Sequence, residues 1–166
     1  MSALDRRRFF KVMGGGLFVF FSTESPTEAQ YRRSPSRAAL PSSNFNAYLQ
    51  IKEDGRVSCF TGKVELGQGI ITSLAQMLAE ELDVSPDSVD MVMGDTDLCP
   101  YDAGTYGSRT TKYFGPQLRE AGAQARAILL EMAAARLDVP QARLAIRDGL
   151  IHDSKNRRKE SFMPIW

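Results

Sequence analysis

The stretch Gly62-Lys-Val-Glu-Leu-Gly-Gln-Gly-Ile-Ile-Thr-Ser-Leu-Ala-Gln-Met-Leu-Ala-Glu-Glu-Leu82 decides how the rest of this chain is arranged. It predicts the end of a strand, a turn bracketed by Gly67 and Gly69, and then a helix, because apolar residues recur at helical spacing after the turn. A glycine turn that opens into a helix presents N–H groups and the positive end of the helix dipole. We therefore expect an anion to bind at this turn, with the Gln68 side chain at its tip.

The composition is that of a globular protein with one domain: 166 residues, 43% hydrophobic and 25% charged. A net charge of +1 gives no broad excess of Lys and Arg, so nucleic acid is not expected as a partner. Cys59 and Cys99 are expected to be two unpaired buried thiols rather than a disulfide. Since the chain has no Cys-x-x-Cys pair, no iron–sulfur cluster is expected in it.

The first 43 residues are expected to lie outside the folded domain. Residues 1–21 join Arg6-Arg-Arg-Phe-Phe-Lys11 to an apolar run that is shorter than the roughly 20 residues needed to span a bilayer, and they resemble a twin-arginine export signal. Residues 22–43 are rich in Ser, Pro, Thr and Arg and indicate a disordered linker. We therefore expect an exported protein that is periplasmic, or membrane-associated if the signal is retained. A cationic amphipathic anchor or a buried helix at residues 1–21 is the alternative.

Residues 44–152 predict an α+β domain in which two helices pack on one face of a small mixed β-sheet. Thr72 or Ser73 is expected to cap the first helix, which ends before Pro86. The expected order is β-β-α-β-α-β, with a hairpin over 44–61, a first helix that follows its cap and runs to about Leu82, a second helix over 116–137, and strands at 89–93 and from about 144. In the second helix the small residues Ala121, Gly122 and Ala125 are expected to allow a close approach to the sheet.

Two segments of this domain echo each other, Glu81-Leu-Asp-Val-Ser-Pro86 and Arg136-Leu-Asp-Val-Pro140. Each predicts a helix end, a turn and a strand, so we expect two equivalent helix-to-strand units on one sheet. Residues 153–166 are expected to form an irregular tail, as in a fragment or after a frameshift near residue 153.

Several motifs in a fixed order carry a family resemblance: Gly62-Lys-Val-Glu-Leu-Gly-Gln-Gly, Ala79-Glu-Glu-Leu-Asp-Val84, Gly94-Asp-Thr-Asp97 and Gly104-Thr-Tyr-Gly-Ser-Arg-Thr110. Together they resemble the molybdopterin-binding large subunits of the xanthine dehydrogenase/aldehyde oxidase family, in particular the exported branch with isoquinoline 1-oxidoreductase beta subunits and nicotinate dehydrogenase large subunits. The resemblance covers about Asn44 to Gly149. It implies the N-terminal part of a molybdenum hydroxylase that oxidises N-heterocycles or aldehydes with oxygen from water.

The resemblance also implies a molybdenum–pyranopterin cofactor, either as molybdopterin or in its cytosine dinucleotide form. We expect two separate loops to converge on it, with Tyr106 facing the substrate and Arg109 paired with a phosphate or pyranopterin oxygen. A small [2Fe–2S] subunit and the remainder of the large subunit are implied partners, with a cytochrome c as a candidate electron acceptor. The cofactor-binding residues carried over from the family are Gly67, Gln68, Gly69, Thr72, Gly104, Thr105, Gly107, Ser108 and Arg109.

No residue of this chain is assigned to catalysis, because the family's catalytic base is a glutamate in a later region of the large subunit. We therefore expect the 166-residue chain alone to be inactive. Asp95, Asp97 and Asp102 do not have the spacing of an EF-hand loop, so no metal site is predicted from them. The alternative is a non-enzymatic exported α+β module, or a remnant without cofactor, in which the glycine loops only form turns.

Overall fold

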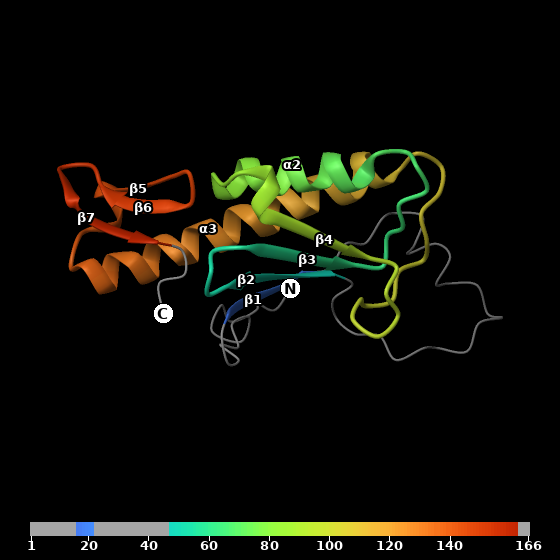
Figure 1. Cartoon of the computed structure of the whole chain (residues 1–166), viewed down its shortest axis with the longest axis horizontal. Coiled ribbons are helices and arrows are strands. Elements are labelled where there is room, and N and C mark those ends of the chain that lie inside the picture. The colour runs from blue at the N-terminus through green and yellow to red at the C-terminus, as the bar shows by residue number, and fades with distance from the viewer. Residues whose placement is uncertain (1–15, 22–46, 163–166) are drawn as a thin grey trace, which may run out of the picture.

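The computed structural model describes residues 16–21 and 47–162, the side chains of 157–162 excepted (Figure 1). In this part of the chain the two long helices lie above a four-stranded sheet, and a smaller sheet follows the second helix (Figure 1). No helix within these ranges has both the length and the apolar character needed to cross a bilayer. The elements are β1 Gly16–Phe21, β2 Ala47–Lys52, β3 Val57–Thr61, α2 Ile70–Leu82, β4 Val89–Met93, α3 Gly115–Leu137, β5 Leu144–Arg147, β6 Leu150–Asp153 and β7 Asn156–Phe162.

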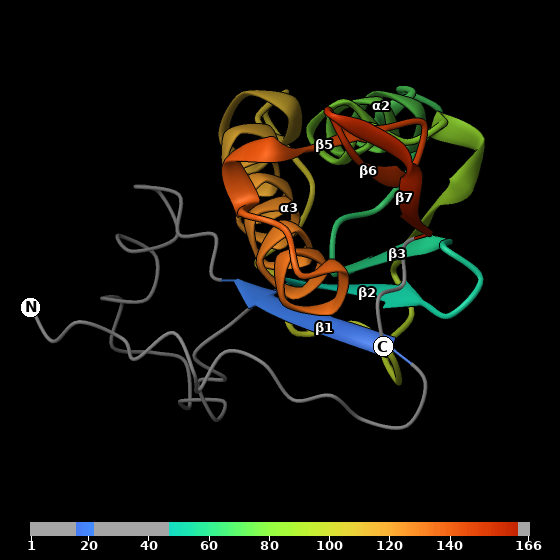
Figure 2. The ribbon, with the colours of Figure 1, turned by 90° about the vertical axis from the view of Figure 1, so that its left-hand side faces the viewer.

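The larger sheet has the order β1-β2-β3-β4, with antiparallel pairing except between β3 and β4, which are parallel. Both helices cover the same face of this sheet, as the end-on view shows (Figure 2). The alternating residues that face the helices form the core and are fully buried, among them Leu49, Ile51 and Val57. The predicted fold class, α+β with two helices on one face of a mixed sheet, is confirmed.

Strand β1 was expected to lie outside the fold, within the export signal, and for residues 16–21 that expectation is wrong. Leu17 pairs with Ile51 and Val19 with Leu49, and both β1 side chains are buried. The Phe21 ring lies 6.1 Å from the ring of Phe114, which precedes α3. An apolar run of this length suits a signal segment and a sheet strand equally well, and here it covers the edge of β2. The rest of the expected signal, residues 1–15, and the expected linker, residues 22–43, lie outside the described residues.

Helices α2 and α3 approach each other closely because two glycines of α3 face α2. A Cβ at Gly122 would lie 2.9 Å from Cβ of Glu81 and 3.1 Å from Cδ1 of Leu78. A Cβ at Gly115 would lie 2.9 Å from Sδ of Met77. The sequence predicted that small residues here allow a close approach to the sheet, but Gly122 allows it to the neighbouring helix.

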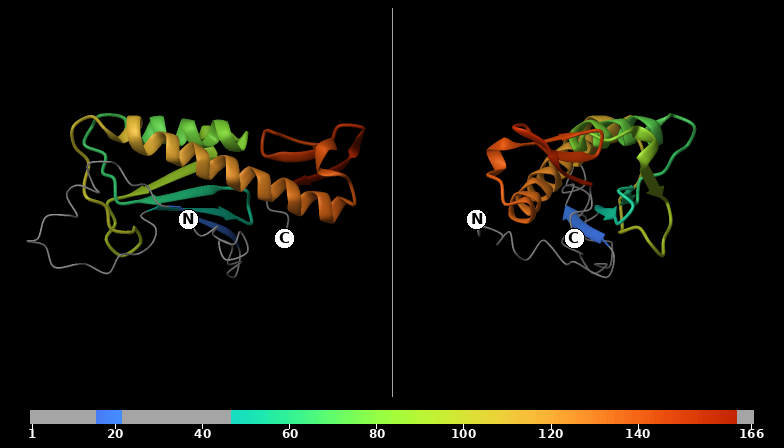
Figure 3. Two further views of the ribbon diagram at one scale, coloured as in Figure 1. Left: turned by 180° about the vertical axis from the view of Figure 1, so that it is seen from behind. Right: turned by 60° about the vertical axis from the view of Figure 1, so that its left-hand side comes forward.

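The internal echo is present in the structure. Helices α2 and α3 have Asp83 and Asp138 as their C-caps, with φ values of 56° and 51°, and each helix is followed by a 3₁₀ turn and a strand. The two units nevertheless enter different sheets, because β5 pairs with β6 and not with the larger sheet. This smaller sheet lies beside the C-terminal half of α3 (Figure 3). It includes β7, so the tail expected to be irregular from residue 153 forms a strand over Asn156–Phe162.

The smaller sheet is held by a buried carboxylate. The side chain of Asp153 is fully buried and accepts hydrogen bonds from the Arg143 guanidinium and from the backbone N–H of Lys155. The N–H of Gly149 donates to the carbonyl of Asp83 at 2.7 Å, which ties the β5–β6 hairpin to the end of α2. The cysteines are both free thiols as expected, with Cys59 buried and Cys99 partly exposed.

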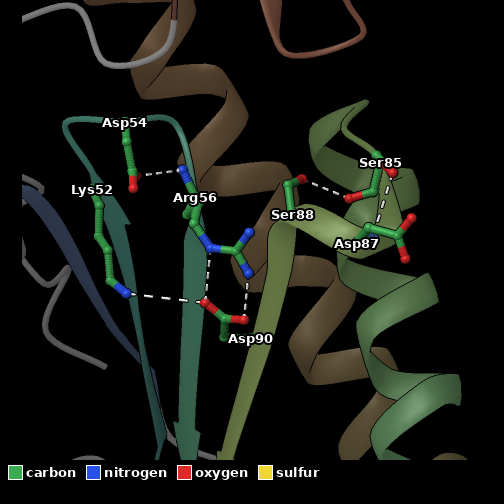
Figure 4. Close-up of polar contacts among 7 residues, drawn as sticks. All are labelled: Lys52, Asp54, Arg56, Ser85, Asp87, Ser88 and Asp90. Atoms are coloured by element: carbon green, nitrogen blue, oxygen red, sulfur yellow. Dashed lines mark hydrogen bonds and ion pairs between the residues drawn. The ribbon is translucent and has the colours of Figure 1, made fainter.

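A small polar cluster braces the end of the larger sheet where β2 turns into β3 (Figure 4). The Arg56 guanidinium forms two hydrogen bonds with the Asp90 carboxylate, at 2.6 and 3.2 Å, and Lys52 Nζ lies 4.0 Å from the same carboxylate. The hydrogen bond from Arg56 holds the pKa of Asp90 below its usual value. This pair joins β3 to β4 across the only parallel pairing in the described strands.

We expect the stabilisation from Asp90 to disappear in acid. Its folded pKa lies below the unfolded value of about 3.9, so the contribution is fully present above that pH and is lost as the pH falls through the folded pKa. Both partners are about 40% exposed, so the effect should stay below about 1 kcal/mol. The gap in free energy of unfolding between wild type and Asp90→Asn should therefore close as the pH falls below the unfolded value and through the folded pKa.

Asp87→Asn is the matched control, since Asp87 contributes its backbone N–H rather than its carboxylate to the contact with Ser85 (Figure 4). A gap for Asp90→Asn that stays constant down to pH 2 would contradict the assignment.

Candidate cofactor-binding site

The two glycine-containing loops lie at the end of the molecule where α2 begins (Figure 1). Residues of both loops line one pocket. The first loop follows β3 and contributes Gln68. The second loop precedes α3 and contributes residues 105, 106 and 108–111. The pocket has a volume of about 380 Å³ and is lined by Leu66, Gln68, Ile70, Thr105, Tyr106, Ser108, Arg109, Thr110 and Thr111. The expected convergence of the two loops is thus present.

The loops are tied together by an ion pair and by hydrogen bonds. Lys63 Nζ lies 2.8 Å from Asp102 Oδ1 and donates to the carbonyl of Gly104 at 3.0 Å. The same Asp102 oxygen accepts from the N–H of Gly104, and the Thr105 hydroxyl accepts from the N–H of Val64, both at 2.8 Å. Each loop therefore fixes the position of the other.

This ion pair is buried. The side chain of Lys63 is 10% exposed and that of Asp102 0% exposed. Gly62 allows the close approach, because a Cβ there would lie 2.5 Å from Cβ of Asp102. Asp102 Oδ2 is buried and has no hydrogen-bond partner among the described residues. Sequence reasoning missed this pair, since its members are 39 positions apart and match no local pattern.

The backbone of the second loop adopts uncommon conformations. Ser108 has φ = 53°, in the left-handed region, and Gly104 and Gly107 also have positive φ. Residues Thr110–Phe114 then form one turn of π-helix before α3 begins. Strained backbone conformations and π-turns are energetically unfavourable and occur most often at functional sites. Their presence in the second loop is therefore consistent with a functional site.

Arg109 gives the pocket its positive charge. Its guanidinium lies over the ring of Tyr106, with Cζ 5.9 Å from the ring centroid. Among the described residues that line the pocket there is no carboxylate, and several carry hydroxyl groups: Thr105, Ser108, Thr110 and Thr111. This set of donors favours an anionic ligand rich in oxygen atoms.

The first loop differs from the prediction, because its amides are already engaged. Glu65 Oε1 accepts from the N–H groups of Gly67 and Gly69, at 2.8 and 2.9 Å, and Oε2 accepts from that of Ile71 at 3.0 Å. These bonds, that of Ile71 above all, hold the pKa of Glu65 below its usual value. The expectation of free N–H groups at this turn is therefore wrong. The strand before this turn, β3, ends at Thr61, so Glu65 belongs to the loop.

The predicted helix caps are wrong as well. The N-cap is Gly69, without a side-chain cap, and α2 begins at Ile70. Thr72 therefore lies within the first turn and away from the pocket lining, while the Ser73 hydroxyl donates to the carbonyl of Ile70. Glu65 takes the role that the sequence suggested for Thr72 or Ser73.

The Gln68 side chain folds back over its own turn. Its Nε2 donates to the carbonyl of Val64 at 3.1 Å, and its Oε1 accepts from the N–H of Leu66. Of the residues carried over from the family, the pocket lining includes Gln68, Thr105, Tyr106, Ser108 and Arg109 and does not include Gly67, Gly69, Thr72, Gly104 or Gly107.

Between the two loops, the carboxylate of Asp95 forms hydrogen bonds with backbone N–H groups. Asp95 Oδ1 accepts from the N–H groups of Asp97 and Leu98, at 2.9 and 3.0 Å, and closes a turn. Four pocket-lining residues were missed from sequence: Leu66 and Thr110, which lie within the quoted motifs, and Ile70 and Thr111, which directly follow them.

Comparison with known sequences identifies the family. Residues 6–165 match the family of the molybdopterin cofactor-binding domain. The chain is 33% identical to the beta subunit of isoquinoline 1-oxidoreductase from Brevundimonas diminuta over 167 residues, which cover 94% of this chain and 21% of that protein. It is 46% identical to a nicotinate dehydrogenase subunit of Pseudomonas putida over 104 residues, 63% of this chain and 9% of that protein.

A solved structure agrees with these sequence matches. Quinoline 2-oxidoreductase from Pseudomonas putida superimposes with a TM-score of 0.62 and 25% identity, over 89% of this chain and 18% of that one. The chain thus spans about a fifth of the length of this protein and of the isoquinoline relative, and less of the nicotinate relative. The resemblance carried by the motifs is confirmed, and this chain belongs to the family of molybdopterin cofactor-binding domains.

Proposed function

We propose that this chain forms part of the cofactor-binding site of an exported molybdenum hydroxylase that oxidises N-heterocycles or aldehydes. The observation that carries the proposal is the pocket between the two loops, with Arg109 as its charged group. The names of two relatives, an isoquinoline oxidoreductase and a nicotinate dehydrogenase, favour an N-heterocyclic substrate. The class of substrate and the identity of the electron acceptor are both proposed here.

The residues of the second loop fit such a cofactor. A molybdenum–pyranopterin group is anionic and rich in oxygen, and the guanidinium of Arg109 with the neighbouring hydroxyls suits those atoms. The first loop fits it by shape, through Leu66, Gln68 and Ile70, since the amides of Gly67 and Gly69 are engaged with Glu65.

In this proposal the chain binds and orients, and the cofactor, when bound, supplies the two-electron oxidation of the substrate. Arg109 pairs with an anionic oxygen, and the hydroxyls of Ser108, Thr110 and Thr111 donate to neighbouring oxygens. Tyr106, 49% exposed at the pocket, covers the substrate side. No lining residue in the described part of the chain is a carboxylate or a histidine that would serve as base. The chain by itself is therefore proposed to be inactive.

The proposed partners are the remainder of the large subunit, a small [2Fe–2S] subunit and, as electron acceptor, a cytochrome c. The large exposed apolar residues among the described ones gather around the two loops and suit a covered surface: Val64, Leu66, Ile71, Leu98, Tyr101 and Tyr106. Export by the twin-arginine route is supported by the sequence Arg6-Arg-Arg-Phe-Phe-Lys11. A cofactor-free module remains the second candidate.

Molybdenum and pterin contents, measured on the protein purified from a host that makes the cofactor, test this function. We expect wild type to retain both, and Arg109→Ala to lose at least about tenfold in occupancy, because a charge-assisted hydrogen bond contributes about 1.5–3 kcal/mol. Arg119→Ala is the matched control, since Arg119 of α3 pairs with Glu80 and Glu81 rather than facing the pocket.

Wild-type protein without molybdenum would favour the cofactor-free module. Equal molybdenum and pterin contents in Arg109→Ala and wild type would show that Arg109 does not contribute to cofactor binding.

A further inference from the structure

We propose that Glu65 is the resident anion of the Gly67-Gln68-Gly69 turn, so that this turn shapes the pocket and does not bind a phosphate of the cofactor. Glu65 is then a positioning residue, which acts through the turn rather than by touching the ligand. The inference rests on the proposed function for the identity of the ligand. Its claim about the turn stands on the hydrogen bonds alone.

The first argument is that the turn has little left to offer an anion. Three of its N–H groups donate to Glu65, those of Gly67, Gly69 and Ile71, within 2.8–3.0 Å. The N–H of Leu66 donates to Oε1 of Gln68, and that of Val64 donates to the Thr105 hydroxyl. Five amides around the turn are thus engaged within the protein.

The second argument is electrostatic. A carboxylate that accepts several backbone N–H bonds is held in its charged form, and here those bonds lower the pKa of Glu65. A phosphate seated on the same amides would have to push this negative charge aside or lie next to it. Arg109, on the second loop, provides a cationic group at the same pocket without that conflict. The anionic end of the cofactor is therefore expected to lie toward residues 105–111.

The third argument is that Glu65 holds together the residues that line the pocket. Its bonds span from Gly67 to Ile71, and Gln68 and Ile70 lie between those positions and form the wall. Without Glu65 this segment would have to keep its shape through Gln68 and two glycines, which leave the backbone unrestrained. Because the wall is already ordered before the ligand binds, the entropic cost of binding is smaller.

The competing idea is that Glu65 is only a placeholder, which the cofactor displaces when it binds the turn. The two ideas predict opposite effects of removing Glu65. A resident anion supports the wall, so its loss lowers cofactor occupancy. A placeholder competes with the cofactor, so its loss leaves occupancy unchanged or raises it.

The test compares Glu65→Ala and Glu65→Gln with wild type, and Glu131→Ala on the exposed side of α3 is the control. Inorganic phosphate is titrated while the amide NMR signals of Gly67, Gly69 and Ile71 are followed, and molybdenum content is measured on parallel preparations. Glu65→Gln keeps one carbonyl oxygen for Gly67 and Gly69, so it should rescue part of what alanine loses.

We expect no phosphate response of these amides in wild type and a clear one in Glu65→Ala. Molybdenum content should fall several-fold in Glu65→Ala, fall less in Glu65→Gln, and stay unchanged in Glu131→Ala. Wild-type amides that respond to phosphate, Glu65→Ala amides that do not, or a Glu65→Ala protein with as much molybdenum as wild type would each overturn the inference. If wild type holds no molybdenum, the proposed function fails, and the phosphate titration still decides whether Glu65 fills the turn.

Discussion

Replacing Gly122 with leucine is expected to lower the free energy of unfolding by about 3 kcal/mol, because the side chain has no space between α2 and α3. Even a Cβ would lie 2.9 Å from Cβ of Glu81 and 3.1 Å from Cδ1 of Leu78. Leu78 is fully buried, and Cβ of Glu81 is fixed by the helix backbone, so neither neighbour can move aside alone. The helices would have to separate, and the core beneath them would lose packing.

Ala123→Leu is the matched control, since position 123 is exposed on the same helix. Urea denaturation of both variants should show a large loss of stability for Gly122→Leu and almost none for Ala123→Leu. Gly122→Ala separates steric crowding from helix propensity. It adds only the crowded Cβ, and it gains roughly 1 kcal/mol in helix propensity relative to glycine. Equal denaturation midpoints for Gly122→Leu and Ala123→Leu would refute the close packing described here.

The role of Gly122 illustrates what the sequence predicts and what it leaves open. Helical spacing of apolar residues predicted α3, and the small residues Ala121, Gly122 and Ala125 predicted a close approach. Spacing does not say which neighbour is approached. Ala121 and Ala125 belong to the buried core, whereas Gly122 faces α2, because each residue points about 100° away from the previous one.

Strand β1 marks a different limit. Residues 16–21 are apolar enough for a signal segment, and nothing within the run itself distinguishes that role from a strand. The decisive information lies in β2, whose buried residues Leu49 and Ile51 pair with Val19 and Leu17. Pairing over such a separation depends on tertiary contacts, which local pattern does not contain.

At the site, sequence reasoning found both loops and missed how their polar atoms are used. The expected cap at Thr72 followed from preferences for hydroxyl side chains at helix starts. The observed N-cap is Gly69, three residues before Thr72, and a carboxylate six positions before Ile71 accepts a hydrogen bond from the Ile71 N–H. Such a contact depends on the curvature of the turn, which the positive φ values of Gly67 and Gly69 create.

Lys63→Met is expected to cost about 3 kcal/mol in free energy of unfolding and to lower molybdenum occupancy, because it leaves the Asp102 carboxylate buried without its cation. Asp102 would keep the N–H of Gly104, but Oδ2 already lacks a partner among the described residues. The carboxylate would then draw in water, and the loop that carries Gly104 and Thr105 would move from the first loop. The pocket wall would be affected on its Arg109 side.

The double variant Lys63→Met/Asp102→Asn provides the control that separates charge from packing. Asparagine keeps an oxygen for the N–H of Gly104 and removes the buried charge, so the double variant should be more stable than the sum of the single losses predicts. Urea denaturation of the four proteins gives this coupling energy directly. Additive losses would show that Lys63 and Asp102 do not act as a pair.

Molybdenum content of the same four proteins then decides what the pair does for the site. If the pair only contributes stability, occupancy should follow the free energy of unfolding and recover in the double variant. If the salt bridge sets the loop position, occupancy should stay low there, because no ammonium group then ties the side chain at position 102 and the Gly104 carbonyl to the first loop. We expect the second result, since buried ion pairs are directional and tolerate few alternative geometries.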